Sequence, residues 1–499
     1  MVDLKLLREK YDAVIFDLGN TLIEQANPGT PLDQLTITLR PGVRRLLEDI
    51  SGELKVAIVS NTTSISAKDI EEKLASISLD KYFQLIIATS EIGIHKPDPY
   101  PIQKAIKDLE VEASRTLYIG DLAGDKQSAL AAGSDFMYST PNLYEGFVSF
   151  IGCDSSPLDR ALSSKAVINQ QNYDLTLREF DGLVKPPGSL GILEKLVARI
   201  SAISGTTSPS VDPAAIAVFI ADHGIAADNS VTPWPQSITG AMAELVVDGK
   251  AAISVLARNA EVYLEVIDLG MITDPISTMI ISSKIRTGTS DIRFGPAMKK
   301  QEAFAAMGVG AETAERLIAG GSRFLGVGEI GIGNTTASAA LIAFFTKKPA
   351  EQVTGRGSGI DNETLARKVE IVRKAVASVP PDSDPIDVLA QVGGFEIAGM
   401  VGFILRAATL NVPVLLDGMI TLAAALVAVE IKSEIKDFVI ASHTSSEPAS
   451  RTVIEHLGLD PILNIGLGIG EGTGAALVIP ILRGACLALR DMERISAII

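Results

Sequence analysis

The feature of this sequence that most constrains its fold is a series of short, continuously apolar runs, each of which ends beside a polar residue. Such runs are typical of parallel strands covered on both faces, because neither face of a covered strand meets water. Segments with amphipathic helical periodicity lie between them, at 44–50, 66–76 and 100–109 in the first part. This alternation predicts α/β architecture with parallel sheets. The predicted strands are 13–17, 55–60, 85–88 and 116–120, then 215–221, 263–268, 413–417 and 437–441.

The chain has 499 residues, enough for about three compact domains. Around residues 141–164 the sequence becomes rich in turn formers and loses any sustained period. We therefore predict a doubly wound parallel sheet over 1–140, a linker over 141–164, and a larger, Rossmann-like α/β domain with an additional helical subdomain over 165–499.

Composition excludes several classes of function. Acidic residues outnumber basic ones by 60 to 44, and the net charge of −16 disfavours binding to nucleic acid or to anionic membranes. The only cysteines, Cys153 and Cys486, are too few for a disulfide framework or a cysteine-based zinc site. Charges interrupt both the N-terminal segment and the apolar region around Arg406 and Asp417. We expect a cytoplasmic protein without membrane spans.

Polar residues with the chemistry of phosphoryl transfer follow the strands of the first part. Asp17, Ser60, Lys96, Asp121 and Asp125 would meet at the carboxyl edge of a doubly wound sheet. They comprise a carboxylate nucleophile, a hydroxyl and an ammonium for phosphate oxygens, and further carboxylates for Mg²⁺. Each has a structural explanation when taken alone, since an aspartate after a strand is often a helix cap. Their order and spacing together favour the functional interpretation.

These motifs, FDLGNTL, VSN, HKPDP and YIGDLAGD, make residues 11–138 resemble the haloacid dehalogenase superfamily. The resemblance implies that Asp17 is the catalytic nucleophile and that Ser60 and Lys96 hold the phosphate. It also implies that Asp17, Asp121 and Asp125 bind Mg²⁺.

The first part departs from that superfamily at one position. Its phosphatases usually carry a second aspartate two residues after the nucleophile, as the general acid, and here that residue is Gly19. Loss of a general acid lowers rates by about 10²–10⁴-fold. The intervals 17–60 and 60–96 are too short for a cap domain, which predicts an open site unless a neighbouring domain or subunit covers it.

The second part carries glycine-rich motifs beside chemically useful side chains. The turn 331–334 runs into Thr335 and an alanine-rich helix, an arrangement that binds anions without the spacing of a P-loop. A second glycine-rich loop, 355–359, precedes a helix that bears Lys368. Glu471 lies in a glycine run flanked by apolar residues, which should raise its pKa toward that of a general base. Each run alone is also explained by tight packing.

His223 follows the predicted strand 215–221 and has no partners at metal-ligand spacing, so we predict a hydrogen-bonded loop histidine rather than a zinc ligand.

Together, the motifs of the second part resemble nicotinate-nucleotide–dimethylbenzimidazole phosphoribosyltransferases. They occur in family order over about 183–485: KPPGSLG, DHG, PQ, GEIGIGNTT, GRGSG, VGGFEIAGM, LLDGMI, ASHTSSEP and GEGTGAAL.

The resemblance assigns roles to individual residues. Glu471 is implied as the general base and Glu329 as a second acidic residue that shares its proton work. Gln236 and Ile469 match positions around the aromatic base, where Trp234 replaces an expected smaller or phenolic residue. The positions that match the ribose-phosphate region are Gly331, Gly333, Asn334, Thr335, Gly357 and Lys368.

The resemblance implies transfer of the phosphoribosyl group of nicotinate mononucleotide to 5,6-dimethylbenzimidazole or a related base, giving α-ribazole 5′-phosphate and nicotinate. It implies a homodimer whose partner completes each site, and no cofactor for the transferase. Two hypotheses stay open for the first part. It dephosphorylates α-ribazole 5′-phosphate or another phosphate ester with Mg²⁺, or it is a non-catalytic assembly or ligand-sensing module.

Overall fold

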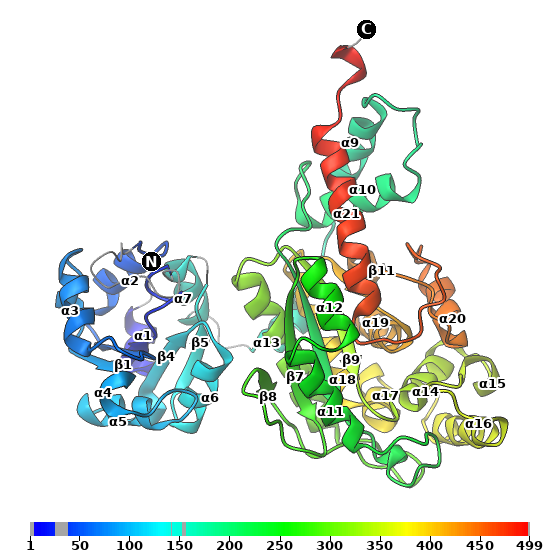
Figure 1. Cartoon of the computed structure of the whole chain (residues 1–499), viewed down its shortest axis with the longest axis horizontal. Coiled ribbons are helices and arrows are strands. Elements are labelled where there is room, and N and C mark those ends of the chain that lie inside the picture. The colour runs from blue at the N-terminus through cyan, green and yellow to red at the C-terminus, as the bar shows by residue number, and fades with distance from the viewer. Residues whose placement is uncertain (1–3, 25–37, 141, 152–155, 498–499) are drawn as a thin grey trace. The chain divides into compact units, whose positions relative to one another are not determined.

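The structure, a computed structural model, describes residues 4–24, 38–140, 142–151 and 156–497. The chain divides into two compact units, one with Met1–Ser155 and the other with nearly all of Ser156–Ile499. Each unit is built on one sheet, and all the strand pairs in both sheets are parallel (Figure 1). The predicted α/β fold class is therefore confirmed.

The sheet of the first unit has the strand order β3-β2-β1-β4-β5. Its strands are β1 (Ala13–Phe16), β2 (Lys55–Ser60), β3 (Leu85–Ala88), β4 (Thr116–Gly120) and β5 (Asp135–Tyr138). The first four were predicted. The fifth was missed because β5 is an edge strand whose first residue is exposed, so its sequence lacks a continuous apolar run. The helices are α1 (Leu4–Lys10), α2 (Val43–Ile50), α3 (Ala67–Ala75), α4 (Thr89–Ile92), α5 (Tyr100–Asp108), α6 (Ala123–Ala131) and α7 (Leu143–Ile151).

Both faces of this sheet are buried, and alternate residues of one strand pack into different cores. Val14 and Phe16 of β1 belong to one apolar cluster, and Ala13 and Ile15 belong to another. A strand covered in this way needs apolar side chains at every position, which explains the continuous runs in the sequence. Because β1 lies between β2 and β4, the chain reverses direction along the sheet there, at the point where ligands bind in doubly wound folds.

The second unit has the strand order β11-β10-β9-β6-β7-β8. Its strands are β6 (Ala214–Ala221), β7 (Tyr263–Gly270), β8 (Ile280–Ser282), β9 (Phe324–Ile330), β10 (Val414–Leu416) and β11 (Val439–Ala441). We did not predict the edge strand β8 or the interior strand β9. Glycines disguise β9, but they have a packing role: a Cβ on Gly328 would overlap the Glu471 carbonyl, and one on Gly326 would lie 2.8 Å from Ile216 Cγ1.

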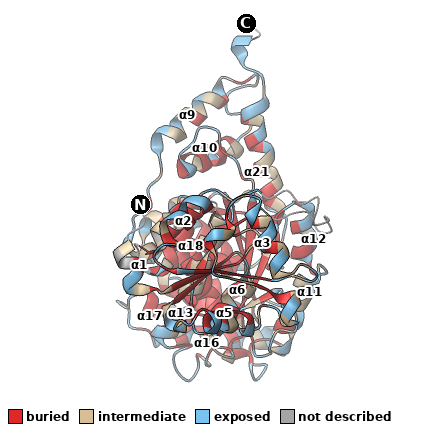
Figure 2. Ribbon diagram, turned by 90° about the vertical axis from the view of Figure 1, so that its left-hand side faces the viewer, coloured by how far each residue is buried: buried red, intermediate tan, exposed pale blue. Residues whose placement is uncertain are grey.

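Helices surround this second sheet, and α9, α10 and part of α21 project beyond it as the predicted helical subdomain (Figures 1 and 2). The helices are α8 (Pro157–Ser163), α9 (Gln170–Asp181), α10 (Ile192–Ser204), α11 (Ser237–Val247), α12 (Ala252–Asn259), α13 (Lys300–Ala319), α14 (Asn334–Thr346), α15 (Ala350–Val353), α16 (Asn362–Ala377), α17 (Pro385–Val392), α18 (Phe395–Thr409), α19 (Met419–Ile431), α20 (Pro448–Leu457) and α21 (Thr473–Asp491).

The segment 141–164, predicted as a linker without sustained periodicity, contains the helices α7 and α8, and the boundary between the two units lies between them. In α7, Leu143, Phe147 and Ile151 are buried in the core of the first unit. In α8, Leu158 packs in the core of the second unit. The four-residue spacing of the α7 side chains was a usable helical signal that the surrounding turn formers obscured. Residues 141 and 152–155 lie outside the described part.

Among the described helices, α21 alone is both long and apolar enough to pass a test for membrane spans. Over half of its apolar window is buried inside the unit, where α21 packs against α10, α12 and β9. A helix in a protein core is also long and apolar, so it passes the same test of length and composition. The two charges that interrupt the apolar region of the sequence lie near the end of α18 (Arg406) and directly after β10 (Asp417).

Helices α13 and α18 pack so closely that one glycine between them has no room for a side chain. A Cβ on Gly310 would overlap the carbonyl oxygen of Gly399, whereas Gly308 in the same helix has open space. We expect Gly310→Ala to destabilise the second unit by about 1–3 kcal/mol through overpacking. Urea unfolding, followed by the fluorescence of the single tryptophan, Trp234, would measure this. The control Gly308→Ala should be neutral or stabilising, and equal effects of the two changes would refute the packing argument.

Candidate active sites

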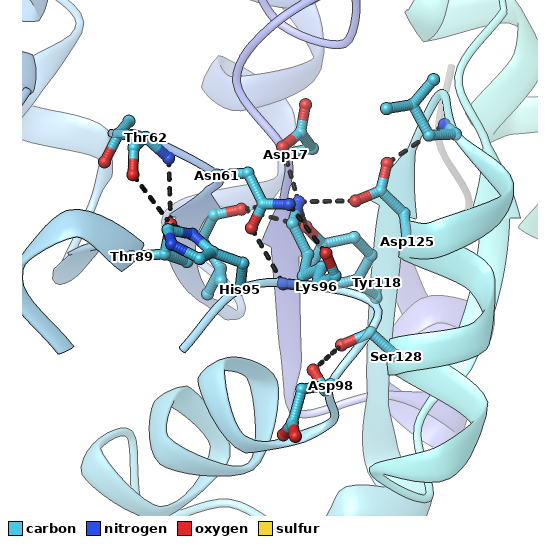
Figure 3. Close-up of polar contacts among 12 residues, drawn as sticks. Asp17, Asn61, Thr62, Thr89, His95, Lys96, Asp98, Tyr118, Asp125 and Ser128 are labelled. Atoms are coloured by element: carbon cyan, nitrogen blue, oxygen red, sulfur yellow. Dashed lines mark hydrogen bonds and ion pairs between the residues drawn. The ribbon is translucent and has the colours of Figure 1, made fainter. Parts of the chain in front are cut away.

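In the first unit, one buried lysine links two carboxylates at the carboxyl edge of the sheet (Figure 3). Asp17 follows β1, Asp125 lies in the first turn of α6, and Lys96 lies in the loop before α5. Lys96 Nζ is 2.6 Å from Asp17 Oδ1 and 2.5 Å from Asp125 Oδ1. Burial opposes the charge on Lys96, but these carboxylates keep its pKa above the ordinary value.

Groups from neighbouring strands fix the position of this lysine. Lys96 Nζ donates to the Tyr118 hydroxyl at 2.7 Å and to the Val59 carbonyl at 3.1 Å. The Asn61 side chain makes two hydrogen bonds, each of 3.0 Å, with the backbone of Lys96 (Figure 3). We did not predict the role of Tyr118, because a tyrosine inside a buried strand is usually a packing residue. Ser60 is buried at the end of β2, directly before Asn61.

The three carboxylates expected to bind metal do come together. Oxygen atoms of Asp17, Asp121 and Asp125 all lie within 4.8 Å of one another. Burial, opposed by Lys96, raises the pKa of Asp17 to about 7, and burial together with Asp125 raises that of Asp121 to about 6. Carboxylate oxygens are the ligands that Mg²⁺ prefers, so this cluster fits the predicted cation.

The prediction that the site has no cap domain concerns two intervals, 17–60 and 60–96, and the structure describes the second in full. Between Ser60 and Lys96 the chain forms α3, a 3₁₀ turn (Asp80–Tyr82), β3 and α4, with no inserted domain in that described stretch. Residues 25–37, in the other interval, lie outside the described residues. At Gly19 a Cβ would have no neighbour within 4 Å.

In the second unit, two buried glutamates lie near the end of β9. The side chain of Glu329 accepts a hydrogen bond from the Asn334 amide, and a Cβ on Gly470 would lie 2.8 Å from its Oε1. Burial and the charges of Asp417, Glu396 and Glu471 raise the pKa of Glu329 well above its ordinary value.

Glu471 has a backbone conformation and a carboxylate environment that are both unusual. Its φ is +63°, a conformation that non-glycine residues rarely adopt. Burial and Asp417 raise the pKa of its carboxyl group, against a hydrogen bond from the Ile253 backbone. Its Oε2 is buried, with no hydrogen-bond partner among the described residues. A carboxylate with a raised pKa and an unused oxygen is suited to accept a proton from a ligand.

Asp417 holds the glycine loop that carries Glu471. Its two carboxylate oxygens accept hydrogen bonds from Gly472 N at 2.8 Å and Gly474 N at 2.7 Å, at the start of α21. His443 Nδ1 lies 3.8 Å from Asp417 Oδ1, and a Cβ on Gly474 would clash with the His443 ring. In the sequence, the motifs LLDGMI and ASHTSSEP indicated no individual role for Asp417 or His443.

The loop after β6 is fixed by hydrogen bonds. His223 Nε2 lies 2.7 Å from Glu396 Oε1, and both side chains are buried. This confirms the prediction of a hydrogen-bonded loop histidine. Gln236 donates to the His223 carbonyl at 2.8 Å. Asp222 accepts from Thr239 at 2.6 Å and from the Ile272 backbone at 2.9 Å.

Residues predicted to bind the ribose phosphate gather at the start of α14. The turn at Gly331 and Gly333 leads into Asn334, which begins the helix. Lys368 Nζ donates to Thr335 Oγ1 at 2.8 Å and to the Gly355 carbonyl at 3.2 Å.

The glycine-rich loop 355–359 closes this cluster. A Cβ on Gly357 would lie 3.0 Å from Thr335 Oγ1 and 3.5 Å from Lys368 Nζ, and the Gly357 backbone donates to Glu447 at 2.9 Å. Burial, opposed by Glu447, lowers the pKa of Lys368 to about 8. Trp234 and Ile469, predicted near the aromatic base, are half-exposed, at 48% and 52%.

Comparisons with known proteins agree with this division of the chain. A family model described as phosphoribosyltransferase matches residues 167–498, and one described as haloacid dehalogenase-like hydrolase matches 21–138. Both predicted resemblances are thereby confirmed.

The second part also matches proteins named nicotinate-nucleotide–dimethylbenzimidazole phosphoribosyltransferase. The protein from Halalkalibacterium halodurans is 43% identical over 62% of this chain and 87% of its own. The one from Acetivibrio thermocellus is 40% identical over 67% of this chain and 95% of its own. The solved structure of CobT from Thermus thermophilus is 38% identical, with a TM-score of 0.63, covering 65% of this chain and 98% of that one.

The carboxylate cluster of the first unit generates a binding prediction. We expect the chain to bind one Mg²⁺, and Asp121→Asn to weaken binding by about tenfold or more, because one negatively charged ligand is lost. Calorimetric titration of the full chain would measure this. Asp98→Asn removes an exposed carboxylate of the same unit and should leave the affinity unchanged. Equal affinities for the wild type and Asp121→Asn would refute the assignment.

Proposed function

This chain belongs to the phosphoribosyltransferase family through its second unit and carries a haloacid dehalogenase-like domain in its first, and we propose a site and a mechanism for each. The second unit is a nicotinate-nucleotide–dimethylbenzimidazole phosphoribosyltransferase. It transfers the phosphoribosyl group of nicotinate mononucleotide to 5,6-dimethylbenzimidazole or a related base. Two hydrogen bonds at neighbouring residues are the observation that supports the proposed site. Buried Glu329 accepts one from the Asn334 amide, and Thr335 accepts the other from Lys368, so an acidic group is linked to the predicted phosphate-binding residues.

The transfer needs a base and an anion site but no redox chemistry. The unprotonated nitrogen of the benzimidazole attacks C1′ of the ribose from the face opposite nicotinate, which inverts the β linkage to α. The bond from C1′ to the pyridinium nitrogen breaks, and its electron pair returns to that nitrogen. The other benzimidazole nitrogen gives up its proton to Glu471, whose unpartnered Oε2 is available for it. Glu329 shares this proton work, and its raised pKa suits that role.

The substrates are held by the remaining residues predicted from the sequence. Lys368 and the backbone and hydroxyl groups at 331–335 bind the 5′-phosphate. Gln236 and Ile469 contact the aromatic base, and Trp234 widens the apolar surface available to it. We propose that the transferase needs no cofactor and works in the cytoplasm as a homodimer.

For the first unit we propose hydrolysis of a phosphate ester. An Asp17 carboxylate oxygen attacks phosphorus while Ser60 and Lys96 hold the phosphate oxygens. The bond from phosphorus to the ester oxygen breaks, and that oxygen leaves with the electron pair and becomes an alcohol by taking a proton from water. Mg²⁺ bound by Asp17, Asp121 and Asp125 would supply positive charge next to the phosphoryl group. Water then releases inorganic phosphate from Asp17.

Candidate substrates for this hydrolysis are the α-ribazole 5′-phosphate made by the second unit and other phosphate esters. The second candidate function is a non-catalytic assembly or ligand-sensing module. The glycine at position 19 favours it, because the usual proton donor is missing there.

Replacing the proposed general base should affect turnover and not substrate binding. We expect Glu471→Gln to reduce kcat by about 10²–10⁴-fold, because glutamine cannot take the proton. Mass spectrometry of α-ribazole 5′-phosphate formation would measure it. The control Glu455→Gln changes an exposed glutamate of the same unit and should retain full activity. Near-normal turnover of Glu471→Gln would remove its assignment as the base.

The lowered pKa of Lys368 predicts a pH dependence. Phosphate binding needs the protonated amine, which is present below pH about 8 and is lost as the pH rises through that value. The KM for nicotinate mononucleotide should therefore be nearly constant from pH 6 to about 8, then rise by up to about tenfold per pH unit. Steady-state kinetics would show this. Lys368→Arg, which stays protonated, should abolish the rise, and a constant KM in the wild type would contradict the role.

Asp17 should be essential in the first unit only. We expect Asp17→Asn to abolish phosphate release, because an amide is a poor nucleophile, and to leave nicotinate release by the second unit unchanged. Coupled assays on the same preparation would measure both. Full residual phosphate release would exclude Asp17 as the nucleophile, and chelation of Mg²⁺ should likewise spare the transferase.

A further inference from the structure

Gly19, two residues after Asp17, occupies a position that would accept a side chain. A Cβ built there has no heavy atom within 4 Å, and φ of Gly19 is outside the left-handed region. Neither packing nor backbone conformation therefore requires glycine. By contrast, a Cβ on Gly120, at the end of β4, would lie 2.6 Å from Asp125 Oδ2. Close packing thus explains the glycine at position 120 and does not explain the one at position 19.

The lysine and the tyrosine nearest to Asp17 already have partners. Lys96 is bound by Asp17, Asp125 and Tyr118, and the Tyr118 hydroxyl donates to the Val59 carbonyl at 3.0 Å.

The remaining carboxylate, Asp121, takes part in the cation cluster and accepts a hydrogen bond from Asn20. Thr21 Oγ1 is buried, and a hydroxyl is too weak an acid to protonate a departing oxygen. All three carboxyl groups described at this site therefore belong to the cation cluster, and none stands apart from it as an acid for the leaving group.

The need for a proton donor depends on what leaves. When the phosphorus–oxygen bond of an alkyl phosphate breaks, the electron pair goes to an alkoxide, which is about as basic as hydroxide. Such an oxygen needs a proton as it departs. A carboxylate, whose conjugate acid has a pKa of about 4, is stable without one. A phosphate leaving from an anhydride is also stable, because its second pKa is about 6.

We propose, on the basis of the phosphate hydrolysis proposed above, that the first unit acts on acyl phosphates and phosphoanhydrides in preference to alkyl phosphate esters. Asp17 attacks phosphorus, and the bond to the leaving oxygen breaks. The carboxylate or phosphate departs with the electron pair and takes no proton. Water then hydrolyses the aspartyl phosphate, which yields inorganic phosphate, restores the Asp17 carboxylate and releases one proton to solvent. The 5′-phosphate of α-ribazole, an ester of a primary alcohol, lies outside this class.

The test compares leaving groups on the full chain with Mg²⁺. The substrates are acetyl phosphate, pyrophosphate, ribose 5-phosphate and α-ribazole 5′-phosphate. We expect kcat/KM for acetyl phosphate or pyrophosphate to exceed that for either alkyl ester by about 10²–10⁴-fold, the usual contribution of a general acid. Activity on acetyl phosphate alone would identify an acyl phosphatase, and activity on pyrophosphate alone an anhydride hydrolase. Acid-quenched samples should also carry a phosphoryl group on the peptide that contains Asp17.

Gly19→Asp is the decisive variant, because the open space accommodates its carboxyl group. It should lower the ratio of acyl to alkyl activity by about 10²-fold by supplying the missing acid. Gly52→Asp is the matched control: it adds the same group to the same unit, at another glycine with no neighbour within 4 Å. This control should leave the ratio unchanged. Thermal unfolding would verify that both variants fold.

Three outcomes would overturn the proposal. Wild-type activities on acyl and alkyl substrates within tenfold of each other would show that leaving-group basicity does not limit the reaction. An unchanged ratio in Gly19→Asp would show that position 19 does not control selectivity. No turnover and no phosphorylated Asp17 with any substrate would also refute the hydrolysis itself and favour the assembly module. Only that third outcome affects the proposed function.

Discussion

Carboxylates buried at the ends of the strands have to be compensated, because an isolated charge away from water is strongly destabilising. In the first unit the compensation is Lys96, shared between Asp17 and Asp125. In the second unit, Asp417 accepts backbone N–H groups and Glu396 pairs with His223. The fold thus supplies partners for both oxygens of Asp417 and for one oxygen of Glu396.

Glu471 is less fully compensated than Asp417, whose two carboxylate oxygens both accept backbone hydrogen bonds. One of its oxygens is buried without a partner among the described residues, and its raised pKa expresses the same imbalance between burial and hydrogen bonding. The loop that carries it is held by Asp417, so the group is poorly compensated but firmly positioned. The surrounding glycines make this possible, because a side chain on Gly328 or Gly474 would displace the loop or His443.

The sequence was most informative where a structural pattern was local. Strands β1 to β4 were predicted because each is a continuous apolar run, whereas the central strand β9 was missed because Gly326 and Gly328 break that run. The convergence of Asp17, Lys96 and Asp125 was predicted because polar residues that follow the strands of a doubly wound sheet meet at its carboxyl edge. The pairing of His223 with Glu396 joins residues 173 positions apart, and no periodicity signals a contact of that kind. The role of Tyr118 was hidden for a related reason, since its hydroxyl acts on a lysine from another loop.

Strand β9, the turn at Gly331–Gly333 and helix α14 form one continuous segment, with Glu329 near the end of the strand and Thr335 in the first turn of the helix. The Asn334 amide also ties the start of the helix directly to Glu329. The spacing between Glu329 and Thr335 is therefore set within one continuous segment, whereas Lys368 reaches Thr335 from a separate helix, α16. A change in the length of this turn would therefore move Glu329 and Thr335 relative to each other.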